Sequence, residues 1–135
     1  MKTLSLKTDS RSQMLDISSQ INALIPENFS SGFCHVFCPH TTAGLAINEN
    51  ADPDVRSDIL KTLDKLVPWD DGSYRHAEGN SAAHLKAILT GASQTIPVEN
   101  GRLALGTWQG LYFCEFDGPR TRTISVRFFK DILTE

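Results

Sequence analysis

The chain has 135 residues, of which 40% are hydrophobic and 21% are charged. This composition suits one folded domain with its own hydrophobic core and excludes a disordered protein. A formal net charge of −3 with scattered lysines and arginines disfavours nucleic-acid binding. No apolar run approaches the roughly 20 residues that span a membrane. We therefore expect a cytoplasmic protein that binds neither nucleic acid nor a membrane.

Hydrophobic periodicity predicts the elements in the first half of the chain. Residues 2–8 alternate leucines with polar side chains, which predicts a half-buried strand. Apolar residues recur at helical spacing over residues 14–25 and predict a helix that ends before Pro26. Residues 32–38 and 43–47 are short apolar runs, and we expect both to form strands.

The second half begins with a clear helix signal. Asp52 is a capping acid and Pro53 follows it at the first helical position, so we expect a helix that begins there and ends before Pro68. Residues 69–79 are polar and rich in turn formers. Residues 82–90 predict a second, short helix that is closed by a glycine.

Strands close the chain. The Asn100–Gly101 pair after the apolar run at residues 93–98 is a strong hairpin signal, and residues 108–116 and 121–129 predict two longer strands. This order of elements predicts one α+β domain that spans the whole chain. We expect a compact, sandwich-like arrangement, with a largely antiparallel sheet or two packed sheets and the helices on the outside.

The three cysteines do not predict disulfide bonds or a zinc knuckle. Cys34, Cys38 and Cys114 are an odd number, and the first two lie in one expected strand, four residues and roughly 13 Å apart. We expect all three to be small, buried, chemically inert side chains.

Three histidines fit none of these structural patterns and suggest a metal site. His76 lies in the polar loop and His84 in the helix that follows it, so a loop that folds back brings both to one ion. His40, after the strand at residues 32–38, supplies a third imidazole for a divalent first-row metal such as zinc. A single histidine more often serves as a hydrogen-bonded loop residue, so both interpretations stay open.

An anion site is the second chemical hypothesis. The helix that begins near Ser81 presents unsatisfied N–H groups and the positive end of its dipole, which suits a phosphate or pyrophosphate. Arg120 either binds the same anion or pairs with Asp117, and together with Arg122 it forms a local positive pocket.

Four further polar or aromatic residues have two interpretations each. Trp108 is either a core or sheet-edge aromatic or, together with Gln109, stacks on and hydrogen-bonds a planar heterocycle. Thr41 and Thr42 either donate to an oxyanion or only end a strand.

Five motifs resemble, in order and spacing, those of the YjbQ-like family, and the match covers nearly the whole chain. The motifs are Pro39-His40-Thr41-Thr42-Ala43 with Asn48-Glu49; Asp52-Pro53-Asp54-Val55 with Asp58; Tyr74-Arg75-His76-Ala77-Glu78-Gly79-Asn80 with Ala83-His84-Leu85-Lys86; Gly106-Thr107-Trp108-Gln109; and Glu115-Phe116-Asp117-Gly118-Pro119-Arg120.

The resemblance implies a small, sandwich-like α+β fold, a homotrimer with sites near subunit contacts, and secondary thiamine-phosphate synthase activity. That reaction joins a hydroxymethylpyrimidine diphosphate to a thiazole phosphate and releases pyrophosphate. The residues that the resemblance implies fall into three roles. The metal set is His40, His76 and His84; the catalytic set is His40, Glu49, Asp58, His76, Glu78 and His84; and the substrate- or phosphate-binding set is Thr41, Thr42, Asn48, Asn80, Trp108, Gln109 and Arg120.

Two other functions fit the same residues. A metal-dependent phosphohydrolase would use a metal-bound hydroxide, and a non-enzymatic protein would bind a metabolite or a metal without turnover. The products distinguish them: a synthase releases thiamine phosphate and pyrophosphate, and a hydrolase releases free phosphate.

Overall fold

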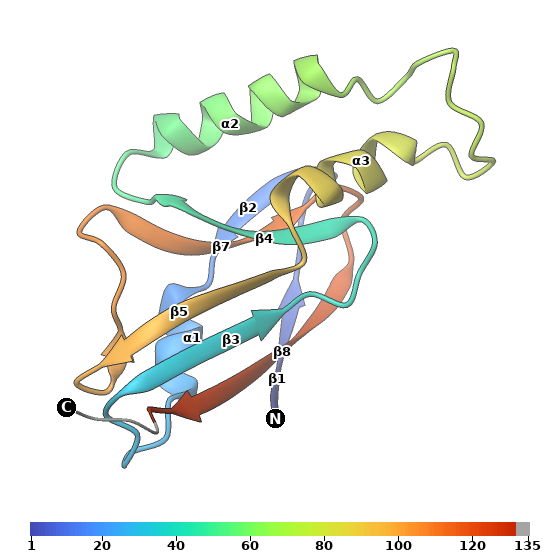
Figure 1. Cartoon of the computed structure of the whole chain (residues 1–135). Coiled ribbons are helices and arrows are strands. Elements are labelled where there is room, and N and C mark those ends of the chain that lie inside the picture. The colour runs from blue at the N-terminus through green and yellow to red at the C-terminus, as the bar shows by residue number, and fades with distance from the viewer. Residues whose placement is uncertain (132–135) are drawn as a thin grey trace.

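The computed structural model describes residues 1–131, and this part of the chain contains eight strands and three helices (Figure 1). The strands are β1 (Lys2–Lys7), β2 (Gln13–Asp16), β3 (Gly32–Phe37), β4 (Ala43–Glu49), β5 (Ser93–Glu99), β6 (Arg102–Leu103), β7 (Gln109–Glu115) and β8 (Thr121–Lys130). The helices are α1 (Ser18–Leu24), α2 (Pro53–Leu66) and α3 (Ser81–Thr90).

The strands form two packed sheets, one of the two arrangements expected. The five-stranded sheet has the order β1-β8-β3-β5-β6, and the three-stranded sheet has the order β2-β7-β4. Within residues 1–131, every pair of neighbouring strands in either sheet is antiparallel. The expected α+β, largely antiparallel architecture with helices outside is therefore confirmed.

The helix predicted over residues 14–25 is wrong in its first half. Met14 belongs to β2, which pairs with β7, and α1 begins only at Ser18. The apolar spacing of residues 14, 17 and 21 fits a helix, but pairing with the buried strand β7 outweighs that local preference. A carboxylate oxygen of Asp16 accepts a hydrogen bond from the Ser18 N–H at 3.0 Å and marks the change from strand to helix.

The main hydrophobic core lies between the two sheets. Strand β7 shows how it is built: Leu111 and Phe113 face the sandwich interior, while Tyr112 and Cys114 face the helices. Both faces of β7 are therefore buried, because a sheet covers one face and helices cover the other.

A second, smaller core lies between the three-stranded sheet and the helices α2 and α3. Figure 1 shows both helices over the outer face of that sheet. Ala83 and Ala87 of α3 pack there with Tyr112 and Phe116. Ile59 and Leu63 supply the apolar stripe of α2, as its periodicity predicted.

Two turns depend on residues that tolerate a positive φ. Gly91 closes α3 at φ 99°, and the β5–β6 hairpin turns through Asn100 and Gly101 at φ 51° and 74°.

The three cysteines are free and buried, as expected. None of the helices in residues 1–131 is long and apolar enough to cross a membrane.

Candidate functional site

Three connections meet at one end of the sandwich. The segment 38–42 links β3 to β4, and the segment 116–120 links β7 to β8, so each passes from one sheet to the other. Antiparallel pairing brings these strand ends together, since Ala43 lies opposite Glu115 in the three-stranded sheet. The loop that feeds α3 comes to the same end.

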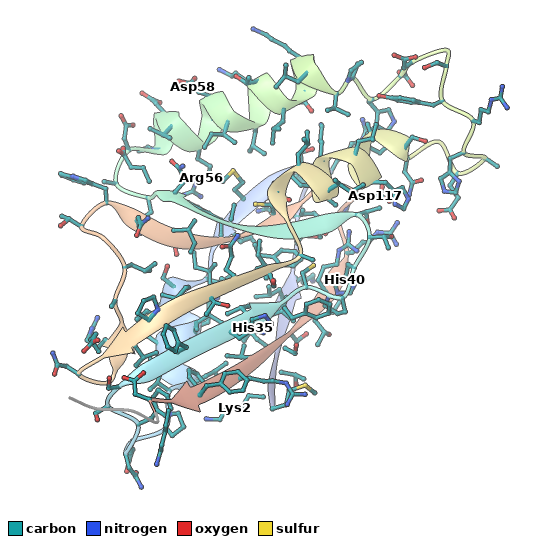
Figure 2. The ribbon with its side chains drawn as sticks, viewed as in Figure 1. Lys2, His35, His40, Arg56, Asp58 and Asp117 are labelled. Carbon is teal, nitrogen blue, oxygen red and sulfur yellow. The ribbon has the colours of Figure 1, made fainter. Side chains whose placement is uncertain are left out.

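These connections enclose a pocket of about 450 Å³. It collects eight of the residues predicted to form the site, from three separate motifs. Figure 2 shows two members of the pocket, His40 and Asp117, at this end of the sandwich. The lining residues are Pro39, His40, Thr41, Thr42, His76, Glu78, Asn80, His84, Asp117, Arg120 and Arg122.

The three histidines predicted to be metal ligands all line this pocket. The rings of His76 and His84 lie edge to face with their centroids 5.4 Å apart, and His76 Nε2 lies 3.8 Å from a carboxylate oxygen of Glu78. The ring of His40 is anchored on the backbone of Thr123, with Nε2 lying 2.9 Å from the carbonyl oxygen and 3.1 Å from the N–H. These contacts fix the ring orientation. In the tautomer in which Nε2 donates to the Thr123 carbonyl oxygen, Nδ1 is the ring nitrogen with a free lone pair.

The donor types suit a first-row metal, but their placement in one copy of the chain does not complete a site. Within residues 1–131 no group of three or more His, Cys, Asp or Glu side chains is placed to hold one ion. The pocket therefore offers imidazoles of the right chemistry without a formed three-ligand cage.

Asp117 organises one wall of the pocket. Its Oδ2 accepts hydrogen bonds from Asn80 Nδ2 and from an Nη of Arg120, both at 2.9 Å. The Arg120 Nε also donates to the Asp117 backbone carbonyl at 2.7 Å. Arg120 thus makes the pairing with Asp117 that was one of its two interpretations, and this contact holds its guanidinium at the rim of the pocket.

Arg122 carries a second guanidinium that lines the pocket, and this side chain is buried, with a relative exposure of 5%. It forms an ion pair with Glu115, which is 0% exposed, through Nε and Nη2. Nη2 also donates to the Thr42 hydroxyl at 2.9 Å. These bonds engage Nε and Nη2, and the side chain lines the pocket.

The Glu115 carboxylate is held charged by its neighbours. Burial alone would raise its pKa, but hydrogen bonds from Arg122, from the Asp117 N–H and from Thr8 together keep the pKa below the ordinary value. Neither Glu115 nor Arg122 is among the predicted catalytic, metal-binding or substrate-binding residues, although Arg122 was expected to contribute to a local positive pocket with Arg120. Both residues lie on the strand face that otherwise carries core side chains. A charged residue at such a position in the sequence is the signal that could have identified them as functional residues.

The cysteines take no part in this chemistry. Burial raises the pKa of the Cys34 thiol to about 11 and, together with the nearby Cys38, raises that of Cys114 to about 12. Neither thiol is a nucleophile at neutral pH, because only the thiolate reacts.

Five predicted site residues lie away from the pocket. Strand β4 begins beside the pocket, but these residues lie at the other end of β4, at the start of β7 or on α2. At that other end Glu49 of β4 pairs with Gln109 of β7. Figure 2 shows one of them on α2, well apart from His40. Trp108 is 63% exposed, so it is not a core residue. The five residues are Asn48, Glu49, Asp58, Trp108 and Gln109.

Comparison with known proteins places the chain in a family. The family model described as UPF0047 protein YjbQ-like matches residues 2–131. The chain belongs to the YjbQ/UPF0047 family.

YjbQ/UPF0047 relatives match over almost their full length. The UPF0047 protein YugU of Bacillus subtilis is 56% identical over 94% of this chain and 97% of its own, and a UPF0047 protein of Methanocaldococcus jannaschii is 46% identical over 93% and 91%. A crystal structure of a YjbQ/UPF0047 protein from Clostridium acetobutylicum has a TM-score of 0.92 at 55% identity, covering 96% of this chain and 100% of that one. A conserved hypothetical protein from Thermus thermophilus has a TM-score of 0.90 at 40% identity, with the same coverage.

Proposed function

We propose that the pocket binds a phosphorylated small metabolite and that the protein is an enzyme of the secondary thiamine-phosphate synthase type. The observation that carries this proposal is the meeting of two guanidinium groups and three imidazoles in one pocket. Arg120 and Arg122 suit the charge of a phosphate or pyrophosphate, and the imidazoles suit proton transfer or metal binding.

The anion-binding part of the proposal rests on groups that are already in place. Arg122 is fixed by Glu115 and Thr42, so its guanidinium needs little reorganisation to meet an anion. The first turn of α3 lies on the same pocket, where Asn80 precedes the helix and His84 follows one turn later. Its N–H groups add the positive end of the helix dipole.

The proposed reaction transfers a pyrimidinylmethyl group. The bond between the methylene carbon and the diphosphate oxygen breaks, the electron pair leaves with the pyrophosphate, and the ring nitrogen of the thiazole phosphate forms the new bond to that carbon. The negative charge that develops on the departing pyrophosphate is the charge that Arg120, Arg122 and the α3 N-terminus would stabilise.

A divalent metal remains part of the proposal, with His40, His76 and His84 as the residues that would hold it. When bound, such an ion supplies Lewis-acid stabilisation of phosphate oxygens. The support for this part is the donor chemistry and the anchoring of His40 on Thr123, which matches the way that metal-binding imidazoles are oriented.

The activity test compares substitutions of pocket histidines with a matched histidine outside the pocket. His76→Ala and His84→Ala are expected to lower the rate of thiamine phosphate formation by about 100-fold or more, the range that general acid–base groups contribute. His35→Ala is the control, because His35 lies within β3 (Figure 2) and does not line the pocket.

Products decide between the proposed reaction and its alternatives. Thiamine phosphate and pyrophosphate in equal amounts support the synthase. Free phosphate alone supports a phosphohydrolase, and tight binding without turnover supports a non-enzymatic binding protein. Full synthase activity in both pocket variants would remove the histidines from the mechanism.

Metal content is measured separately by elemental analysis of the purified protein. The proposal expects about one metal ion per pocket in wild type and in His35→Ala, and loss of that metal in the His76→Ala/His84→Ala double variant. Wild-type protein that stays metal-free after soaking would reject the metal and leave the histidines as acid–base groups.

We also propose that the protein is a cytoplasmic homotrimer. The outer face of α3 supports the assembly, since Leu85, Ile88 and Leu89 are 42%, 77% and 62% exposed. The free cysteines fit a reducing compartment. Light scattering coupled to size-exclusion chromatography should give three times the chain mass of 14.9 kDa, and Ile88→Asp should reduce the mass to that of one chain.

A further inference from the structure

Two pockets meet at the pair formed by His76 and His84. The first is the polar pocket described above, and the second, of about 550 Å³, has the same two imidazoles in its wall. The two rings lie edge to face with their centroids 5.4 Å apart. Because the pair borders both pockets, one molecule can reach from one pocket into the other.

The two pockets differ in chemistry. The polar pocket carries the guanidinium groups of Arg120 and Arg122. The second pocket has a mostly apolar lining, in which the phenol ring of Tyr74 and the aliphatic side chain of Leu85 join the two imidazoles. Arg75 also lines it, and a guanidinium can stack on an aromatic face. A wall with several flat rings suits an uncharged aromatic ring better than a phosphate.

Tyr74 is held in place before any ligand binds. It is half-buried, and its hydroxyl donates to the carbonyl oxygen of Pro68 at 2.9 Å. Its backbone N–H donates to the carbonyl oxygen of Asp71 at 3.1 Å and closes a turn in the loop before α3. Because the hydroxyl is already engaged, the ring is what Tyr74 offers to the pocket. A ring that is fixed in advance loses little side-chain entropy when a ligand packs on it.

We infer that this second pocket is the subsite for an aromatic or heteroaromatic ring that a short linker joins to the phosphate, and that the ring packs on Tyr74. The ligand class is therefore an arylmethyl phosphate or diphosphate. This inference rests on the proposed function, since it assumes that the phosphate binds Arg120 and Arg122. The histidine pair then lies beside the linker, where the bond to the leaving group is made or broken.

Tyr74 takes the role that the sequence suggested for a different aromatic residue. Trp108 lies just before β7, at the end of that strand away from the polar pocket. A ring attached to a phosphate in that pocket is therefore expected to meet Tyr74 and not Trp108.

The test uses two phosphate monoesters of equal charge and equal carbon number. Benzyl phosphate carries an aromatic ring, and cyclohexylmethyl phosphate carries a saturated ring of similar size. Leu85 is shared with the α3 face proposed for the trimer, so the titrations use the assembled protein. Isothermal titration at pH 8 is expected to show about fivefold tighter binding of benzyl phosphate, the effect of one aromatic contact. Burial alone would favour the more hydrophobic saturated ring.

Substitutions of the two aromatic residues locate the ring. Tyr74→Leu should make the two dissociation constants nearly equal, whereas Tyr74→Phe keeps the ring and should keep the preference. Trp108→Leu is the matched control, because it removes an exposed ring outside the pocket and should leave the preference unchanged. Circular dichroism and thermal melting establish that each variant is folded before its ratio is interpreted.

Arg120→Gln tests whether one molecule occupies both pockets. The phosphate contact is common to the two probes, so this variant should weaken both by a similar factor and leave their ratio unchanged. Binding of both probes that is unaffected by Arg120→Gln would separate the ring from the polar pocket and overturn the inference.

The remaining outcomes distinguish the inference from the proposed function. Equal or reversed affinities in wild-type protein overturn the inference and leave the phosphate pocket intact. A preference that survives in folded Tyr74→Leu, or that disappears in folded Tyr74→Phe or Trp108→Leu, also overturns it, because the ring is then recognised in another way. Binding of neither probe removes the phosphate pocket and the inference together.

Discussion

Arg122 and Glu115 form a buried ion pair that connects the two sheets of the sandwich at the pocket end. Arg122 comes from β8 in the five-stranded sheet, and Glu115 comes from β7 in the three-stranded sheet. Arg122 lines the pocket and Glu115 supports it from behind. The pair therefore couples the stability of the fold to the charge that the pocket presents.

Removing the charge of Glu115 should destabilise the protein strongly. Glu115→Gln keeps the shape of the side chain but leaves the Arg122 guanidinium buried without a counter-ion, and breaking such a pair costs about 3–5 kcal/mol. Chemical denaturation measures the loss in free energy of unfolding. The double substitution Glu115→Leu/Arg122→Met should recover much of it, since an apolar pair needs no compensation. A loss below about 1 kcal/mol for Glu115→Gln would show that the pair is not truly buried.

The same carboxylate predicts how stability depends on pH. Its pKa is lower in the folded protein than the value of about 4.3 for an unfolded chain. A depressed folded-state pKa contributes stability that is complete above the unfolded value and is lost as the pH falls through the folded value. The denaturation midpoint is measured at pH values from 7 to 3. It should decrease once the pH drops below about 4.3, and the decrease should be smaller in Glu115→Gln. An identical profile in both proteins would contradict the assignment.

Close packing of α3 on β4 makes Gly44 sensitive to substitution. A Cβ atom at this position would lie 2.1 Å from the Thr90 hydroxyl and 2.8 Å from the Gly91 carbonyl oxygen. Gly44→Ala should therefore cost about 1–3 kcal/mol, the range for overpacking a core. Gly72→Ala is the matched control, since nothing lies within 4 Å of its added Cβ, and its melting temperature should stay close to that of wild type.

The buried thiols should resist alkylation in the native state. With pKa values of about 11 for Cys34 and about 12 for Cys114, almost no thiolate is present at pH 8. A chromogenic thiol reagent should react with none of the cysteines in the native protein within minutes and with three after denaturation in guanidinium chloride. Rapid stoichiometric labelling of native protein would contradict the burial on which this prediction depends.

The sequence predicted the strands other than β2, and the helices α2 and α3, because each has a strong local signal. Asp52 and Pro53 define where α2 begins, and the Asn100–Gly101 pair defines the β5–β6 hairpin. Residues 14–16 were predicted wrongly because their state depends on pairing with β7, a partner almost 100 residues away in the chain. Local periodicity cannot report such a contact.

The pocket was predicted in part, for a similar reason. His40, His76 and His84 stood out as polar residues at element ends, and the fold brings all three to one place. Arg122 and Glu115 lie two residues from the core residues Ile124 and Phe113, so the alternation of their strands places them on the buried face. Only the three-dimensional structure shows that these two charges neutralise each other across the sheets.

The β5–β6 hairpin gives the protein a natural attachment point for reporters. Antiparallel pairing sets Val98 of β5 opposite Gly32, at the start of β3, whereas His40 follows the other end of that strand, roughly 20 Å away. Arg102 is exposed in this hairpin. A cysteine introduced by Arg102→Cys would be the one thiol in residues 1–131 open to a maleimide dye. Ligand titrations could then be followed by fluorescence without a label crowding the pocket.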